Sequence, residues 1–200
     1  VVDSIPKLVA SRILQPVFDC EAPVRLICRE GGLQSLLGDL AVHQLDLILS
    51  DRPIPSGLSV KAFSHTLGSS EIAIFGRRGV RRQYEKNFPA SLDKAPILLP
   101  TKENPIRRPL EDWFEQNEIS PRLVAEFEDS ALMKSFGAMG NGLFPSPATI
   151  SEEVEQMYHA HCIGPATGVM ETYFAISPER KLKHPAALRI IEAARKQLLS

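Results

Sequence analysis

Short apolar runs alternate along this chain with segments in which apolar residues recur every three or four positions. The runs predict strands at 24–28, 45–49, 58–67, 72–75, 97–99, 122–127, 143–144 and 171–176. The periodic segments predict helices at about 5–18, 33–40, 107–117, 132–139, 151–159 and 185–199, and a helical turn at 89–94. Strands that alternate with helices are typical of an α/β fold whose sheets are largely parallel.

The beginning of the chain predicts the capped start of a helix near Ile5. Asp3 and Ser4 are residue types that accept hydrogen bonds from the first turn of a helix. Pro6 suits that turn because its missing N–H needs no partner there, and Pro16 is expected to end or bend the helix. The two valines before the cap are typical of the end of a strand, so we expect the natural protein to be longer at this end.

The segment 126–147 is the most informative part of the sequence. A predicted strand ends there in two carboxylates, Glu128 and Asp129, and a helix, a glycine-rich turn and a short strand follow, which together form a βαβ unit. The apolar stripe of that helix is predicted to comprise Leu132, Met133, Phe136 and Met139. Since ligands of open α/β sheets bind outside the carboxyl ends of the strands, the segment predicts a ligand-binding domain.

Composition and charge exclude some functions. The net charge of −1 gives no basic excess for a DNA-binding surface, and we find no apolar run long enough to cross a membrane. The three cysteines, Cys20, Cys28 and Cys162, lack the CxxC spacing of metal and redox motifs. They are expected to be reduced thiols in a cytoplasmic protein.

Three motifs together carry a resemblance to a known family. They are Glu30–Leu37, Leu45–Asp51, and the turn and strand at Gly137–Pro147. With the polar cap at the start of the chain, they resemble the effector-binding domain of LysR-type transcriptional regulators over nearly the whole sequence. The runs Phe127–Met139 and Asp3–Lys7 narrow the resemblance to the branch of the family that regulates sodium/proton antiporters.

The resemblance implies two Rossmann-like α/β subdomains with a cleft between them, as in type 2 periplasmic binding proteins. Subdomain I is expected at 1–66 plus 167–200 and subdomain II at 67–166, although no strand is obvious within 148–168 for the return crossover. The resemblance also implies a homodimer or tetramer. DNA is expected to be bound only through an N-terminal winged helix-turn-helix that this sequence does not include.

The predicted effector cleft is lined by residues at the strand ends. They are Asp3, Ser4, Ser50, Asp51, Thr101, Glu128, Asp129 and Ser146. Carboxylate oxygens are the ligands of hard cations, so Asp3, Asp51 and Asp129 are candidate cation ligands, in keeping with a Na⁺- or Li⁺-responsive regulator. Helix capping is the alternative role for these carboxylates and for the hydroxyls of Ser4 and Thr101.

The resemblance also implies a dimer interface. The first helix and the strand at 24–28 of one chain are expected to meet the helix at 107–117 and the strand at 122–127 of another. The predicted interface residues are Leu8, Val9, Arg12, Leu26, Trp113, Phe114 and Val124. Ordinary burial within one chain is the alternative for the apolar members.

Other chemistry finds little support in the sequence. His159, His161 and Cys162 have metal-ligand side chains, but no second cluster accompanies them, so a loop is the favoured interpretation. No GxGxxG or nucleophile-elbow motif is present, and no cofactor is predicted. The favoured function is a sensing domain of a transcriptional activator that responds to a small effector. The alternatives are a solute-binding protein of a transport system and an enzyme such as a dehydratase.

Overall fold

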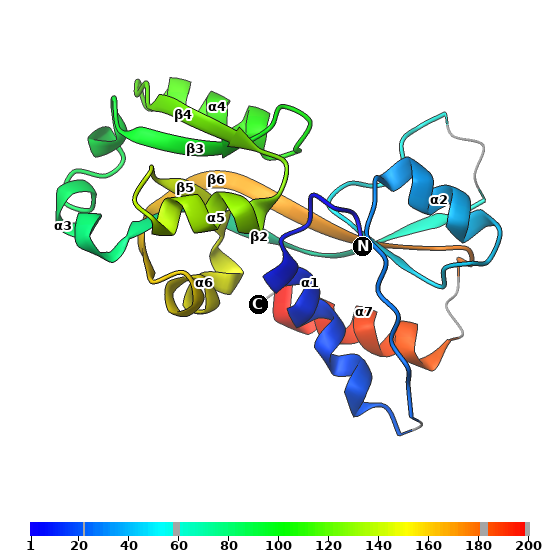
Figure 1. The fold of residues 1–200 in the computed structure, drawn as a ribbon. Coiled ribbons are helices and arrows are strands. Elements are labelled where there is room, and N and C mark those ends of the chain that lie inside the picture. The colour runs from blue at the N-terminus through cyan, green and yellow to red at the C-terminus, as the bar shows by residue number, and fades with distance from the viewer. Residues whose placement is uncertain (22, 58–60, 181–183, 199–200) are drawn as a thin grey trace. The chain divides into compact units, whose positions relative to one another are not determined.

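The computed structural model describes residues 1–21, 23–57, 61–180 and 184–198, which form two compact units (Figure 1). Unit 1 comprises Val1–Ser69 and Thr172–Ser200, and unit 2 comprises Ser70–Glu171. The chain passes between them twice, within the long strands β2 (Phe63–Arg77) and β6 (Ala160–Ser177). The assignment of the units as regulatory subdomains, with the boundaries given above, stays a prediction. No helix in these described ranges is long and apolar enough to span a membrane.

Unit 1 contains α1 (Lys7–Leu14), the 3₁₀ helix η1 (Gln15–Asp19), α2 (Leu33–Ala41), β1 (Ile48–Ser50) and α7 (Pro185–Leu198). Helices α1 and α7 lie side by side, and α2 contacts β1 (Figure 1). β1 pairs antiparallel with the end of β6, where Ile48 lies opposite Ile176. The helical periodicity of α2 places Leu36, Leu37 and Leu40 on one face, where they are buried with these strand residues.

Unit 2 contains η2 (Arg78–Val80), α3 (Arg81–Tyr84), η3 (Ala90–Leu92), β3 (Pro96–Pro100), α4 (Arg107–Gln116), β4 (Arg122–Phe127), α5 (Ser130–Ala138), β5 (Phe144–Pro147), η4 (Ala148–Ile150) and α6 (Ser151–Met157). β3 and β4 are parallel, because α4 carries the chain back to the same end of the sheet. Leu110, Trp113 and Phe114 of α4 are buried in one cluster with Ile97 and Leu99 of β3.

The α/β class is confirmed, but the prediction of largely parallel sheets is only partly right. β1 pairs antiparallel with β6, and β5 pairs antiparallel with β2. The cause is the length of β2 and β6, which are 15 and 18 residues long. Strands of this length reach neighbours in both units, whereas the sequence pattern divides each of them into shorter segments.

The boundaries of these long strands were also predicted wrongly. The extended segments predicted at 58–67 and 72–75 belong to one strand, β2, as far as they are described, and residues 58–60 lie outside the described part. The return strand β6 already begins at Ala160. Gly164, Pro165 and Gly168 interrupt its apolar pattern. Because glycine and proline are depleted from ordinary strands, the sequence did not indicate a strand here.

Two predictions near the start of the chain need correction. The predicted strand at 24–28 is described but belongs to no strand, and Ile27 is 66% exposed. A strand requires a partner for its backbone groups, and no described segment provides one along these residues. Helix α1 begins at Lys7 rather than near Ile5, because Pro6 has an extended backbone with ψ of 129° and serves as the N-cap without a side-chain bond.

Candidate functional site

In unit 1, the beginning of the chain lies beside the end of β1. The N–H of Val2 donates a hydrogen bond to the carbonyl of Leu49 at 2.9 Å. This pairing places Ser4 next to Asp51, the first residue after β1, and the Ser4 hydroxyl donates to Oδ2 of Asp51 at 2.6 Å. The structure thus brings these two candidate residues together, and their role in binding an effector stays a prediction. The capping role predicted for Ser4 and Asp3 is wrong, because Pro6 is the N-cap of α1.

The carboxylate of Asp51 is buried and already has partners. Nε of Arg52 donates to Oδ1 at 2.9 Å, and Nη2 donates to Oδ2 at 3.3 Å. Ser50 shapes the same turn, since its hydroxyl donates to the carbonyl of Arg52 at 2.7 Å. Asp3 is exposed. Because the guanidinium of Arg52 balances the charge of Asp51, a cation at this position must compete with it.

In unit 2, three chain segments run in the same direction and end close together. The N–H of Thr101, just after β3, donates to the carbonyl of Phe127 at the end of β4 at 3.0 Å. Ile97 of β3 forms a parallel bridge with Leu143, three residues before Ser146. Thr101, Ser146 and the residues that follow Phe127 therefore lie towards one edge, at the carboxyl ends of these segments.

Asp129 is the residue directly before helix α5. Its Oδ1 accepts a hydrogen bond from the N–H of Leu132 at 2.6 Å, which is the geometry of an N-cap. The capping alternative is confirmed for this residue. Glu128, its neighbour, is exposed.

Ser146 is the polar residue of this edge that lacks a protein partner. Its side chain is 1% exposed, and its Oγ forms no hydrogen bond with any described atom. A buried hydroxyl without a partner costs about 1–3 kcal/mol. The position is thus favourable for a ligand atom or a water molecule that completes its hydrogen bonding.

Lys134 was missed by the sequence interpretation. It is 2% exposed on α5, and Nζ donates to the carbonyl of Ser130 at 3.3 Å. Burial lowers the pKa of Lys134 to about 8, while the charges of Glu171 and Asp129 oppose the shift. Glu171 is itself buried, with 3% exposed. Two ionisable groups buried in the same region make this part of unit 2 electrostatically unusual.

The predicted apolar stripe of α5 is right for Met133 and wrong for Leu132, Phe136 and Met139. The buried residues of the helix are Met133, Lys134 and Gly137, whereas Leu132 is 51% and Met139 71% exposed. Apolar periodicity pointed to the wrong face, because the buried face carries a lysine and a glycine. The close approach of the Phe144 ring requires that glycine, since a Cβ at position 137 lies only 2.0 Å from Cδ1 of Phe144.

Arg107 is a second buried charge that the sequence pattern did not reveal. It donates from Nη1 to the carbonyl of Pro100 at 2.6 Å and to Glu126, and from Nε to Glu111 at 2.8 Å. Burial lowers its pKa, but the hydrogen bonds to the two glutamates outweigh burial and leave the pKa raised. Arg107 therefore remains charged and ties the ends of β3 and β4 to α4.

Within the described ranges, no three His, Cys, Asp or Glu side chains are grouped so that they could hold a metal ion. His161 is the second residue of β6 instead of lying in the predicted loop, and its Nδ1 lies 3.4 Å from a carboxylate oxygen of Glu155. Burial raises the pKa of the Cys162 thiol. The cation-ligand role of Asp3, Asp51 and Asp129 stays a prediction.

The predicted dimer residues fall into groups by exposure. Val9, Trp113 and Phe114 are buried within a single chain, with at most 6% exposed, so their burial needs no partner. Val124 is 42% exposed on β4. The remaining three are Leu8 and Leu26, which are half-buried, and Arg12, which is exposed. Their role in an interface stays a prediction.

The chain is similar to curated transcriptional activators. The transcriptional activator protein NhaR of Escherichia coli (strain K12) is 34% identical over 190 residues, which are 95% of this chain and 62% of the relative. NhaR of Shigella flexneri gives the same values. The chain thus spans 62% of the length of these relatives.

Solved regulatory domains share its fold. The reduced regulatory domain of OxyR2 from Vibrio vulnificus matches with a TM-score of 0.70 at 15% identity, over 98% of this chain and 92% of that chain. The regulatory domain of CcmR from Synechocystis PCC6803, in complex with 2-PG, gives 0.68 at 12% identity, over 98% and 94%. The effector binding domain of QuiR, in complex with shikimate, gives 0.63 at 12% identity, over 99% and 94%.

The sequence pattern of the family described as LysR substrate binding domain matches residues 21–199. This match covers most of the chain and agrees with the fold and with the curated relatives. It decides against the solute-binding-protein alternative and places the chain in a family of transcriptional regulators. The chain belongs to the family of LysR substrate binding domains, the effector-binding domains of LysR-type regulators.

Proposed function

We propose that this domain binds a small effector at the strand ends of unit 2 and thereby controls transcription activation by a larger regulator. The observation that carries the proposal is the hydroxyl of Ser146, which is buried and unpartnered among the described atoms at the edge where Thr101 also lies. An effector that hydrogen-bonds there removes the cost of a buried hydroxyl. Ser4, Ser50 and Asp51 stay predicted contacts of unit 1.

The chemistry of these positions favours an effector with polar oxygen atoms over a bare cation. Asp51 is paired with Arg52, and Asp129 is engaged as the N-cap of α5. Hydroxyl groups and the N-terminus of a helix are suited to an anionic or neutral polar group. Na⁺ and Li⁺ remain in the proposal as the effectors that the antiporter-regulator resemblance predicts, and the experiment below includes them.

Thermal unfolding of the domain tests the proposal. The panel comprises Na⁺, Li⁺ and K⁺ chlorides and small organic acids, with choline chloride as the ionic-strength control. A ligand that binds only the folded state at 100 times its Kd stabilises that state by about 2.7 kcal/mol, so the melting temperature rises. A rise specific to Na⁺ or Li⁺ identifies a cation, whereas a rise with an organic acid identifies an anionic effector.

Variants identify the site. Ser146→Ala and Thr101→Val are expected to abolish most of the melting shift that the effector produces in the wild type. Ser135→Ala is the matched control, because the Ser135 hydroxyl already donates to the carbonyl of Ala131 within α5. If Ser146→Ala keeps the full shift, Ser146 does not bind the effector and the proposal loses its main support.

A further pair of variants tests the cation. If Asp51 and Asp129 are ligands of Na⁺ or Li⁺, Asp51→Ala and Asp129→Ala alter the effector response and leave dimerisation intact. An unchanged response in both folded variants excludes that role for these carboxylates.

The larger protein is proposed to act as a cytoplasmic homodimer or tetramer that binds DNA through an N-terminal winged helix-turn-helix. The effector switches such an assembly only if it binds one arrangement better than another. We propose no catalytic activity and no cofactor for the domain, in keeping with its place in a family of regulators.

A further inference from the structure

The segment 77–86 of unit 2 concentrates positive charge that the composition of the whole chain conceals. It contains five basic side chains and one acidic side chain, so its formal charge is +4. Because the net charge of the whole chain is −1, the residues outside this segment together carry −5. A local basic excess attracts polyanions even where the protein as a whole has none. The basic residues are Arg77, Arg78, Arg81, Arg82 and Lys86.

The local structure gathers most of these charges on one side of a helical run. The 3₁₀ helix η2 leads directly into α3 (Figure 1). Residues three and four positions apart lie on the same face of a helix, so Arg78, Arg81 and Arg82 are neighbours there. Lys86 follows Arg82 by four positions, and all four side chains are exposed. The charges thus form one surface rather than scattered single sites.

The opposite side of the run attaches it to the core of unit 2. Val80 and Tyr84, which are also four positions apart, pack in the main hydrophobic cluster of this unit. The N–H of Arg78 donates to the carbonyl of His159 at 3.3 Å, and the hydroxyl of Ser91 donates to the carbonyl of Tyr84. The backbone beneath the basic side chains is therefore ordered before a partner binds, which lowers the entropic cost of binding.

Three of the basic side chains on this surface have no acidic partner. Arg81 pairs with Glu85, where Nη2 lies 2.7 Å from Oε1. By contrast, Arg78, Arg82 and Lys86 form no ion pair with any described residue. Their charges are available to an anion from outside the chain.

The side-chain chemistry favours phosphate groups over an acidic protein. The large apolar residues of the segment, Val80 and Tyr84, pack inward. A protein partner usually requires an apolar or aromatic core in the interface, whereas interfaces with nucleic acids are more polar and strongly positive. Arginine also presents a planar guanidinium that binds two phosphate oxygens at once.

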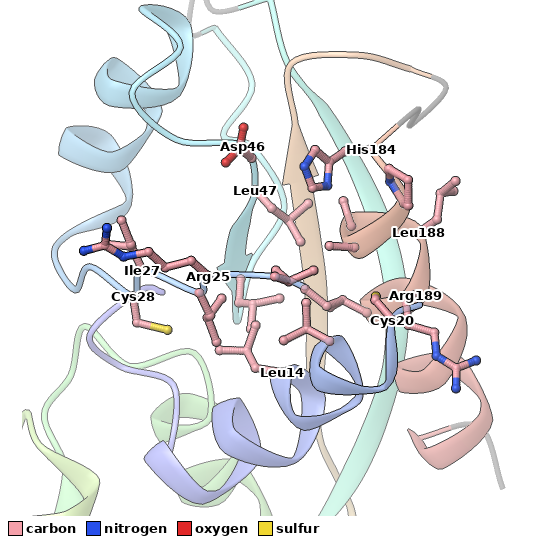
Figure 2. Close-up of a pocket in the computed structure, with 18 of the residues that line it drawn as sticks. Leu14, Cys20, Arg25, Ile27, Cys28, Asp46, Leu47, His184, Leu188 and Arg189 are labelled. Carbon is pink, nitrogen blue, oxygen red and sulfur yellow. The ribbon is translucent and has the colours of Figure 1, made fainter. Parts of the chain in front are cut away.

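The arrangement also differs from that of a pocket for a small anion. An open groove of about 1100 Å³ lies in unit 1, with Leu14, Ile27 and Leu47 among its lining residues (Figure 2). None of the basic residues of 77–86 lines this groove. They are spread along a helical run instead, which suits an extended polyanion that contacts several side chains in turn.

We propose that the segment 77–86 binds the phosphate backbone of duplex DNA without reading its sequence. The chain belongs to a family of transcriptional regulators, so DNA is the polyanion on which such a protein acts. The contact is separate from the effector site proposed above, and it goes beyond the expectation that DNA is bound only through a winged helix-turn-helix. It adds affinity through the release of counterions and therefore weakens as the salt concentration rises.

Binding of the domain to a short duplex of random sequence tests the proposal. Fluorescence anisotropy measures the association constant at several salt concentrations between about 50 and 200 mM. Arg78→Gln combined with Arg82→Gln removes two phosphate contacts. The slope of the logarithm of the association constant against the logarithm of the salt concentration is then expected to become shallower by about 2.

Lys94→Gln combined with Lys102→Gln is the matched control. Both lysines are exposed in unit 2, and the pair removes the same charge outside the segment. Its slope is expected to equal that of the wild type. Urea unfolding followed by Trp113 fluorescence verifies that each variant is folded.

Each of three other outcomes overturns the proposal. Equal slopes for the arginine variant and the lysine control show an effect of net charge alone. A wild-type domain that does not bind the duplex at the lowest salt concentration has no DNA contact of this kind. Labelled polyglutamate that binds more tightly than the duplex, and less tightly to the arginine variant, identifies an acidic protein as the partner.

Discussion

At the scale of single residues, the buried ammonium of Lys134 is the least expected feature of unit 2. Burial disfavours its charged form strongly enough to lower its pKa to about 8, even though Glu171 and Asp129 favour the charge. A buried charge of this kind stabilises a fold only weakly, because its desolvation offsets the attraction of nearby opposite charges. In the folded chain, the Lys134 amine therefore loses its proton at a pH just above neutrality.

The charge of Lys134 predicts a pH dependence of stability. The unfolded chain holds this proton up to pH about 10.5, and the folded chain only up to about 8. Between these values the unfolded state binds more protons, so the free energy of unfolding rises with pH. The lysine thus costs stability below pH 8 and stops costing it above 10.5, a change of up to about 3 kcal/mol.

Lys134→Met removes this contribution. Urea unfolding at several pH values from 7.5 to 10.5, followed by the fluorescence of Trp113 in unit 2, compares the variant with the wild type. The free energy of the wild type is expected to rise relative to Lys134→Met across this window. Lys102→Met, which changes an exposed lysine, is the control. A constant difference between wild type and Lys134→Met contradicts the prediction.

The sequence allowed part of the site to be predicted. Asp129 was placed correctly at the start of a helix, because a capping residue acts locally, three positions from the N–H it binds. Ser4 and Asp51 were both placed at strand ends, but the hydrogen bond between them was not predicted. Lys134 and Arg107 were missed, because a charged residue on a helix is usually exposed and only the tertiary structure shows that these two are buried.

At the scale of elements, the cap of α5 gives a separable prediction. Asp129→Ala removes the side-chain oxygen that binds the N–H of Leu132 and is expected to lower the free energy of unfolding by about 1 kcal/mol. Asp129→Asn keeps an oxygen at that place and is expected to lose only a few tenths of a kcal/mol. Urea unfolding followed by Trp113 fluorescence measures both. If the two variants lose equally, the negative charge at the helix N-terminus matters more than the hydrogen bond.

Elements with a strong local pattern were predicted well. Helix α4 spans Arg107–Gln116 where 107–117 was expected, and β4 spans Arg122–Phe127 as predicted. The failures are elements whose formation depends on a partner. The segment 24–28 has strand-forming residues but no described backbone partner. Strand β6 gains its length from pairing, although it contains glycines and a proline. Sequence periodicity describes one segment and contains no information on its partner.

At the scale of the whole molecule, β4 is the exposed apolar element that a second copy is predicted to cover. β3 is its neighbour in a two-stranded sheet, so the other side of β4 is an edge among the described residues. Leu123 and Val124 are each 42% exposed on this strand. An apolar edge strand tends to associate, and the predicted dimer covers it with α1 and 24–28 of the partner.

Val124→Lys tests this interface. A lysine at a position that becomes buried between two copies must lose water around its charge, so dimerisation is expected to weaken at least about 10-fold, or about 1.4 kcal/mol. Leu132→Lys is the matched control, since Leu132 is an apolar residue of unit 2 that is 51% exposed and lies outside the predicted interface. Sedimentation equilibrium measures the dissociation constant of each variant. Equal dissociation constants for Val124→Lys and the wild type contradict a dimer through β4, whereas weakening by Leu132→Lys alone moves the interface to α5.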